Sequence, residues 1–273
     1  MRTLVTGATG RLGQALCPRL RAKGHTVRAA STSPPANEDG DGEWVELDLA
    51  SGEGIEGAME GVDVVVHAAS APTGDTEAVD VEGTKRLLSA AADAGVENFV
   101  YVSIVGIEEI PYSYYDAKLA AERAIEDSDV PHTILRATQF HEFVADIFEM
   151  FSWLPVWPLP TKLRLQPVAV DDVADVLVDH AVSDPQGPMP PMGGPTVHTV
   201  GELARAYRDA KGLRRAVVRL PTPTATFRAF RDGEATCPDR AVGTVTFETW
   251  LAEAVGPSGT SSATTASPRA DTT

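Results

Sequence analysis

The chain has 273 residues, with 23 lysines and arginines against 39 aspartates and glutamates, and its formal net charge is −16. This acidic balance argues against a nucleic acid partner and against an anionic membrane surface. The two cysteines, Cys17 and Cys237, indicate neither a disulfide framework nor a metal site. No signal peptide precedes the first predicted strand, and no apolar run approaches the roughly 18 residues that a membrane span needs. We therefore expect a cytoplasmic protein.

Residues 2–24 read as a strand, a glycine turn and a helix. An apolar run ends at Thr6, a turn occupies 7–10, and leucines then recur every four residues, as on one helix face. Glycines allow the chain to reverse, leave the helix N-terminus open to a pyrophosphate, and let helix and strand pack closely. Pro18 predicts a kink in this helix. The cofactor contacts predicted here are Thr6, Gly7, Thr9, Gly10, Arg11, Leu12 and Gly13.

The second predicted strand, 25–30, is followed by Ser31, Thr32 and Ser33. An acidic residue at this place usually binds the ribose of NAD, whereas NADP enzymes replace it and supply a cation. Because no acid is present and Arg11 and Arg28 are nearby in the sequence, we favour NADP(H) over NAD(H). The alternative is that both arginines are solvated surface charges.

The following segments alternate between strand and helix patterns. Residues 33–42 are a loop by composition, and strands and helices are then predicted at 44–47, 51–59, 62–69, 76–95 and 98–103, a further helix at 112–128 and a strand at 131–138. This alternation predicts an α/β fold, a Rossmann-type doubly wound parallel sheet with right-handed crossovers. Its ligands are expected at the carboxyl ends of the strands.

The C-terminal part has less regular patterns. Residues 151–160 are apolar and broken by prolines, unlike a strand or a helix, and 163–170 predict a strand followed by a helix N-capped by Asp171. A helix at 199–211, a strand at 216–220, interrupted helices at 222–255 and a disordered tail at 257–273 complete the chain. We expect a nucleotide-binding domain at 1–140 and a smaller α/β substrate-binding region at 141–256, with 163–182 returning to the first domain.

Four motifs stand out in the chain: Thr6-Gly7-x-x-Gly10-x-x-Gly13, His67-Ala68-Ala69-Ser70, a Tyr-x-x-x-Lys spacing at 114–118, and the stretch 166–174. Together they resemble the atypical or extended short-chain dehydrogenase/reductase superfamily, in its NmrA-like, NAD(P)H-binding branch. The resemblance covers residues 2–182 well and 183–255 only by layout. Many relatives carry an arginine where this chain has Thr32.

The resemblance implies positions for the cofactor and the substrate. It places Asp48 and Leu49 beside the adenine, although Asp48 could instead cap the following helix, and it gives His67 a usually structural role. The implied cofactor contacts are Asp48, Leu49, His67, Ala68, Ala69, Lys118, Ala137 and Thr138, beside Arg28, Ser31 and Thr32 above. The implied substrate contacts are Gln139, Phe140 and Phe143.

The resemblance also implies a catalytic group of Tyr114, Lys118 and Ser103. Residues 114 and 118 share a helix face. A free phenol titrates near 10, and a neighbouring ammonium would lower the pKa of Tyr114 toward a useful value. Ser103 would hydrogen-bond the substrate oxygen. The alternative is a surface tyrosine and lysine on an amphipathic helix.

These positions indicate an NAD(P)-dependent oxidoreductase that moves hydride to or from a small carbonyl, quinone or alcohol. One alternative is an NmrA-like dinucleotide sensor without turnover. Another is a nucleotide-sugar epimerase or dehydratase, against which we note no basic C-terminal cluster suited to a diphosphate. The resemblance is compatible with a monomer or a homodimer.

Overall fold

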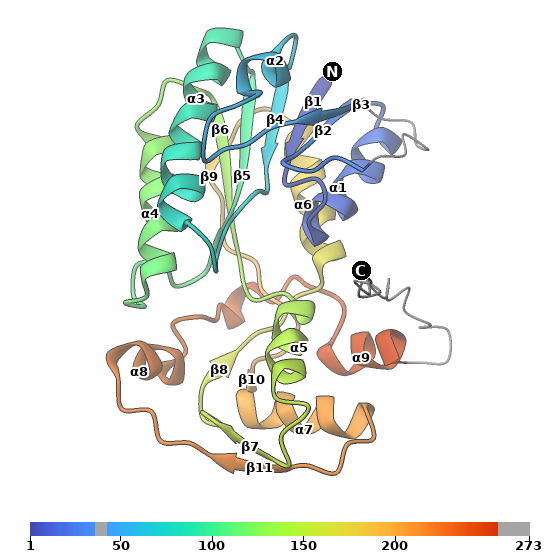
Figure 1. Cartoon of the computed structure of the whole chain (residues 1–273), viewed down its shortest axis with the longest axis vertical. Helices are drawn as coiled ribbons and strands as arrows, with labels where there is room; N and C mark the ends of the chain where they lie inside the picture. The colour runs from blue at the N-terminus through green and yellow to red at the C-terminus, as the bar shows by residue number, and fades with distance from the viewer. Residues whose placement is uncertain (36–42, 256–273) are drawn as a thin grey trace, which may run out of the picture.

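The computed structural model describes residues 1–35 and 43–255, which form two lobes (Figure 1). The larger lobe contains a seven-stranded sheet in which every pairing is parallel, in the order β3-β2-β1-β4-β5-β6-β9. The α/β fold and its parallel sheet are confirmed. The strands are β1 (Arg2–Thr6), β2 (Thr26–Ser31), β3 (Glu43–Glu46), β4 (Val64–His67), β5 (Asn98–Ile104), β6 (His132–Ala137) and β9 (Gly187–Pro188).

Helices cover both faces of this sheet, as expected for a doubly wound fold (Figure 1). One face packs on α1 and α6, and the other packs on α2, α3 and α4, each through its own apolar core. Strand order reverses between β1 and β4, so a ligand crevice is expected at the carboxyl ends of those two strands. The helices are α1 (Arg11–Ala22), α2 (Ile55–Met59), the π-helix η1 (Glu77–Glu82), α3 (Gly83–Ala94), α4 (Ser113–Glu126) and α6 (Val170–Ala181).

Several local predictions for this lobe need correction. The helix α1 runs from Arg11 to Ala22 with Pro18 inside it, and the kink expected at Pro18 stays a prediction. The helix α2 begins at Ile55 rather than 51, because Gly52 and Gly54 adopt positive φ angles of 88° and 82° that interrupt a helix. The helix expected at 76–95 opens with a π-helical turn, and a Cβ on the following Gly83 would lie 2.7 Å from Leu49 Cβ.

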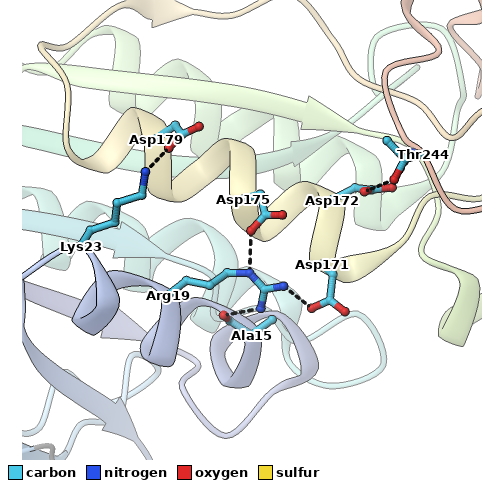
Figure 2. A network of polar contacts seen from close by, with 8 residues as sticks. All are labelled: Ala15, Arg19, Lys23, Asp171, Asp172, Asp175, Asp179 and Thr244. Atoms are coloured by element: carbon cyan, nitrogen blue, oxygen red, sulfur yellow. Dashed lines mark hydrogen bonds and ion pairs between the residues drawn. The ribbon is translucent and has the colours of Figure 1, made fainter.

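The helix α6 returns the chain to the larger lobe by packing against α1. Arg19 on α1 lies between Asp171 and Asp175, at 2.8 and 2.7 Å, and Lys23 contacts Asp179 at 3.0 Å (Figure 2). Asp171 is not the N-cap that we predicted; Ala169 holds that position without a side-chain hydrogen bond. Asp171 and Asp172 in the first turn of α6 instead bond to Arg19 of α1 and to Thr244.

The smaller lobe packs two short two-stranded sheets against helices. Its core includes the fully buried Trp157, Leu203 and Phe148. The predicted irregular stretch 151–160 in fact contains a strand, and the strand predicted at 163–170 shrinks to two residues. The elements are α5 (His141–Met150), β7 (Val156–Leu159), β8 (Arg164–Leu165), β10 (His198–Thr199), α7 (Val200–Ala210), β11 (Ala216–Arg219), α8 (Ala225–Asp232), the 3₁₀-helix η2 (Pro238–Arg240) and α9 (Phe247–Val255).

Two sequence predictions concern residues outside the described ranges. Most of the loop predicted at 33–42 and the tail predicted at 257–273 lie there. The described residues contain no group of three or more His, Cys, Asp or Glu placed to hold a metal ion.

Candidate functional site

A cleft of about 370 Å³ opens at the carboxyl ends of β1 and β4, where the strand order reverses. This volume lies in the range typical of small-molecule sites. Ten of the residues that the sequence assigned to cofactor binding line it: Thr6, Gly7, Thr9, Gly10, Ser31, Thr32, Asp48, Leu49, Ala68 and Ala69. Five further lining residues were not predicted from the sequence: Ala30, Leu47, Ser70, Ala71 and Val79.

The glycine turn is shaped by close backbone contacts. Gly7 has a φ of +65°, and a Cβ there would lie 2.8 Å from the Ala69 backbone. A Cβ at Gly13 would lie 2.3 Å from the Gly7 carbonyl oxygen, so the helix can pack on the turn only because residue 13 has no side chain. Gly13 therefore shapes the turn without lining the cleft.

The N-terminus of α1 fits a pyrophosphate. Its N-cap is Gly10, which lines the cleft and provides no side-chain cap, and the first turn has no acidic residue. The N–H groups at a helix N-terminus lack intrahelical partners and carry partial positive charge. An anionic group in the cleft would satisfy them, which is how nucleotide phosphates bind such turns.

Several polar side chains line the cleft. The hydroxyls of Thr9 and Ser31 lie 3.0 Å apart. Asp48 accepts hydrogen bonds from the Ser51 hydroxyl and the Ala50 N–H, both at 2.9 Å, and these bonds lower the pKa of its carboxyl group. Asp48 thus shapes its own turn and lines the cleft, but it does not cap the following helix, because the N-cap of α2 is Gly54.

Neither of the two candidate cations lines the cleft. Arg28 is 5% exposed, donates to the carbonyl oxygens of Ala58 and Glu60, and pairs with Glu43 at 2.9 Å. We therefore withdraw Arg28 as a phosphate ligand, because its guanidinium is held by these partners away from the cleft. Arg11 pairs with Asp146 of α5 at 2.6 Å, and both side chains are about half exposed.

Four further residues assigned to the cofactor have buried structural contacts instead. His67 hydrogen-bonds Thr6 and Thr84, and burial, together with the charge of Lys118, lowers the pKa of His67 to about 3. Thr138 donates its hydroxyl proton to the Gln166 carbonyl oxygen. Leu12 and Ala137 belong to the apolar core between the sheet and the helices α1 and α6. These four side chains are packed in the protein interior. A cofactor could therefore contact only the backbone atoms of these residues.

Tyr114 reaches the cleft through a short chain of hydrogen bonds. The Ser70 hydroxyl donates to the Asp80 carboxylate at 2.5 Å and lies 2.9 Å from the Tyr114 hydroxyl. Since the single proton of Ser70 goes to Asp80, Tyr114 is the donor in the second bond. Asp80 is 1% exposed and also accepts from the Ala71 N–H. This chain links the proposed acid to the wall of the cleft.

Lys118 does not lower the pKa of Tyr114, contrary to the expectation from the sequence. Burial raises the pKa of Tyr114 to about 12, against the opposing effect of its bond with Ser70. The Lys118 ammonium instead donates to the Val102 carbonyl oxygen at 3.0 Å and lies 4.1 Å from the ring centre of Tyr101. Burial lowers the pKa of Lys118 to about 8, opposed by Asp80 and Glu122.

Ser103 lies on the same face of β5 as Tyr101, two residues further along the strand. Both hydroxyl groups are buried and have no hydrogen-bond partner among the described residues. A buried hydroxyl without a partner is uncommon in a folded protein and often marks a functional position. The unpartnered Ser103 hydroxyl is compatible with a substrate oxygen as its missing partner.

The three residues assigned to the substrate lie around the junction of the lobes. Gln139 is 8% exposed, and its amide donates to the Ala235 carbonyl oxygen at 3.1 Å. Phe140 packs on the core below the sheet, whereas Phe143 on α5 is 51% exposed. Gln139 therefore holds the lobes together, and Phe143 is the residue of the three with a freely accessible side chain.

Ser70 and Asp80 are the functional candidates that sequence reasoning missed. Ser70 directly follows the small residues Ala68 and Ala69, so its place beside the cleft could have been anticipated. Asp80 stands between Val79 and Val81 within a predicted helix. A carboxylate flanked by apolar residues was the available signal, but the π-helical turn that brings it to Ser70 has no recognised pattern in the sequence.

A family comparison matches the NAD(P)H-binding family over residues 7–184. The chain therefore belongs to this family. The uncharacterized protein Rv2047c of Mycobacterium tuberculosis is 34% identical over 227 residues, which are 82% of this chain and 24% of that protein. The chain thus spans about a quarter of that relative's length.

Solved structures share the fold. The NADPH-dependent quinone oxidoreductase QOR2 of Escherichia coli, complexed with NADPH, has a TM-score of 0.77 at 17% identity, covering 92% of this chain and 99% of that one. A short-chain dehydrogenase/reductase superfamily protein of Agrobacterium tumefaciens with bound NAD has a TM-score of 0.73 at 21% identity, covering 93% of this chain and 96% of that one.

Among the described residues, no helix is both long and apolar enough to cross a membrane.

Proposed function

We propose that the protein is an NAD(P)-dependent oxidoreductase that acts on a small carbonyl, quinone or alcohol. The observation that carries this proposal is the Tyr114 hydroxyl, 2.9 Å from Ser70, a residue of the cleft wall. The Tyr114 hydroxyl is therefore a proton donor next to the cleft, and the glycine turn of that cleft suits a dinucleotide. The quinone oxidoreductase of Escherichia coli that shares the fold adds a substrate class to test.

The chain's own residues would bind, orient and protonate. The glycine turn and the α1 N-terminus would hold the pyrophosphate, and Asp48 would face the adenine. The bound nicotinamide would supply or accept the hydride. Tyr114 would turn from Ser70 toward the substrate oxygen and give it a proton during reduction, while Ser103 would hydrogen-bond the same oxygen. Lys118 would hold the nicotinamide ribose.

A change of Tyr114 to Phe tests this assignment. We expect kcat to fall by about 10²- to 10⁴-fold, the usual contribution of a positioned general acid, with little change in dinucleotide affinity. The rate would be measured with a panel of carbonyls and quinones. Tyr112→Phe is the matched control, because Tyr112 lies on the same turn and is 45% exposed. An unchanged kcat in Tyr114→Phe would remove Tyr114 as the acid.

We also propose that NADP(H) is preferred over NAD(H). Positions 31 and 32 of the cleft are Ser and Thr, so neither has a carboxylate that would bind a ribose diol and repel a 2′-phosphate. The Arg11 side chain at the start of α1 is about half exposed. Parallel calorimetric titrations with NADPH and NADH would measure the preference. We expect NADPH to bind at least about tenfold more tightly, equivalent to about 1.4 kcal/mol, and Arg11→Gln to reduce that ratio. Equal affinities would refute the preference.

Dinucleotide binding without turnover is the second candidate. The pKa of Tyr114 near 12 favours it, because no cation lowers this pKa among the described residues. This candidate predicts tight dinucleotide binding and no hydride transfer to any substrate of the panel. Tyr114→Phe would then leave the only measurable property, the affinity, unchanged.

A further inference from the structure

The outer face of the small lobe carries an apolar ribbon. Strands β7 and β11 run parallel, with Val156 opposite Ala216 and Pro158 opposite Val218. Alternate residues of β7 point inward, and Trp157 is fully buried. The outward residues are therefore all apolar, and Val156 and Val218 are 44% and 49% exposed. An outward sheet face in contact with water would normally carry polar side chains.

Larger exposed apolar side chains flank these strands in the chain. Trp153 is 75% exposed and Met150 is 71% exposed, and the Trp153 indole N–H donates to the Met150 carbonyl oxygen. Leu220, 46% exposed, continues β11 and donates its N–H to the Leu159 carbonyl oxygen. We call residues 150–164 and 211–222 the lobe tip. It contains five of the ten large apolar side chains that are exposed in the described residues.

The second segment of the lobe tip, 211–222, lies within a strongly basic part of the chain. Residues 205–231 contain eight lysines and arginines and one aspartate, a charge of +7 in a protein of −16. Arg208 and Lys211 have carboxylate partners, whereas Arg214 and Arg219 form no ion pair among the described residues. Our argument against an anionic membrane surface used the net charge of the whole chain, and that net charge conceals this local basic segment.

Three cations of this region meet at one small depression. Lys162, Arg219 and Arg231 line it together with apolar residues of the lobe tip, and no carboxylate is among its described walls. The remaining lining residues are Pro160, Leu163, Leu220, Pro221 and Thr222. Cations beside exposed apolar side chains suit a phosphate that sits at an apolar boundary.

We propose that the lobe tip docks the protein on the surface of an anionic phospholipid membrane. Trp153, Met150 and Leu220 enter the interfacial layer, and the arginines contact lipid phosphates. Tryptophan is favoured at this depth, and juxtaposed Lys and Arg add electrostatic attraction. A second copy of the chain fits less well, because two such basic faces would repel each other. The tip lies at the end of the molecule away from the large sheet, so the dinucleotide cleft is not covered by docking (Figure 1).

Vesicle co-sedimentation of the full chain tests the proposal independently of any enzyme activity. Vesicles of phosphatidylcholine alone are compared with equal mixtures of phosphatidylcholine and phosphatidylglycerol, at low and at high salt. We expect binding to the anionic vesicles, with a blue shift of tryptophan fluorescence, and about tenfold weaker binding when Arg214 and Arg219 are both changed to Gln. High salt should weaken binding in the same direction.

Matched variants separate the lobe tip from general charge and hydrophobicity. Trp153→Ala should weaken vesicle binding, whereas Arg123→Gln on α4 and Val182→Ala after α6 should not. Circular dichroism establishes that each variant is folded. Absence of binding to anionic vesicles would overturn the proposal, as would an equal effect of the Arg123 control.

Two other occupants would also overturn it. Free pyrophosphate that binds at the three-cation depression while vesicles do not would assign the basic cluster to a soluble diphosphate ligand. A dimer in sedimentation equilibrium that Trp153→Ala converts to a monomer, again without vesicle binding, would assign the lobe tip to a second copy.

Discussion

The two lobes differ in how they build a core from the sequence. The large lobe repeats one local unit, a buried parallel strand followed by a helix, and its glycine turn is fixed by backbone contacts within a few residues and with the segment after β4. The small lobe assembles its core from α5, β7, α7, α9 and short paired strands that lie far apart in the chain. Function follows the same division in our proposals: the large lobe provides a site shared with its family, and the small lobe provides a surface of its own.

The largest expected effect tests the close packing of the glycine turn. Gly13→Ala would place a Cβ 2.3 Å from the Gly7 oxygen and 2.6 Å from Ala8 Cα, both backbone atoms. We expect a loss of about 3 kcal/mol or more in the free energy of unfolding, measured by urea denaturation. Gly57→Ala is the matched control, because it also lies in a helix but has open space around it. That control should gain about 0.5–1 kcal/mol, and equal effects would contradict the packing argument.

A smaller effect is expected from the buried histidine of the large lobe. Because the pKa of His67 is about 3 when folded and near 6.5 when unfolded, the unfolded chain binds the proton first as the pH falls. The stabilisation from the neutral imidazole is therefore complete above about pH 6.5 and declines toward pH 3. Between about pH 7 and pH 5 the loss is about 2 kcal/mol, measured by urea denaturation at each pH.

A change of His67 to Gln removes this titration. We expect a shallower decline of stability with acid in that variant, whatever its stability at neutral pH. Identical slopes in wild type and His67→Gln would show that other groups cause the acid sensitivity.

The smallest effect concerns a helix of the small lobe. The Thr199 hydroxyl accepts from the Glu202 N–H, and the Glu202 carboxylate accepts from the Thr199 N–H at 2.7 Å, which is a capping box at the start of α7. Thr199→Ala should cost about 1 kcal/mol, measured by thermal unfolding, and Thr199→Ser should restore most of it. No loss in Thr199→Ala would show that tertiary packing alone holds α7.

Most of the large lobe could be predicted from the sequence because its signals are local. Near-continuous apolar strands, glycines at fixed spacing and four-residue leucine periodicity specify the elements around the cleft, and ten predicted cofactor residues line it. The errors arise where partners are distant. Arg28 reads as an accessible cation, but α2 and β3 surround it. His67 was a predicted cofactor contact with a usually structural role, and its buried bonds with Thr6 and Thr84 support the structural role.

Residues that are neighbours in the chain were enough to specify the family, the parallel sheet and the position of the glycine turn. Which side chains face the cleft depended instead on tertiary contacts. These contacts joined Tyr114, Ser70 and Asp80 and directed the Lys118 ammonium to a backbone carbonyl. They also paired β7 with the distant β11, which exposes an apolar ribbon among arginines. Packing between distant segments creates these arrangements, and no local pattern of residues encodes that packing.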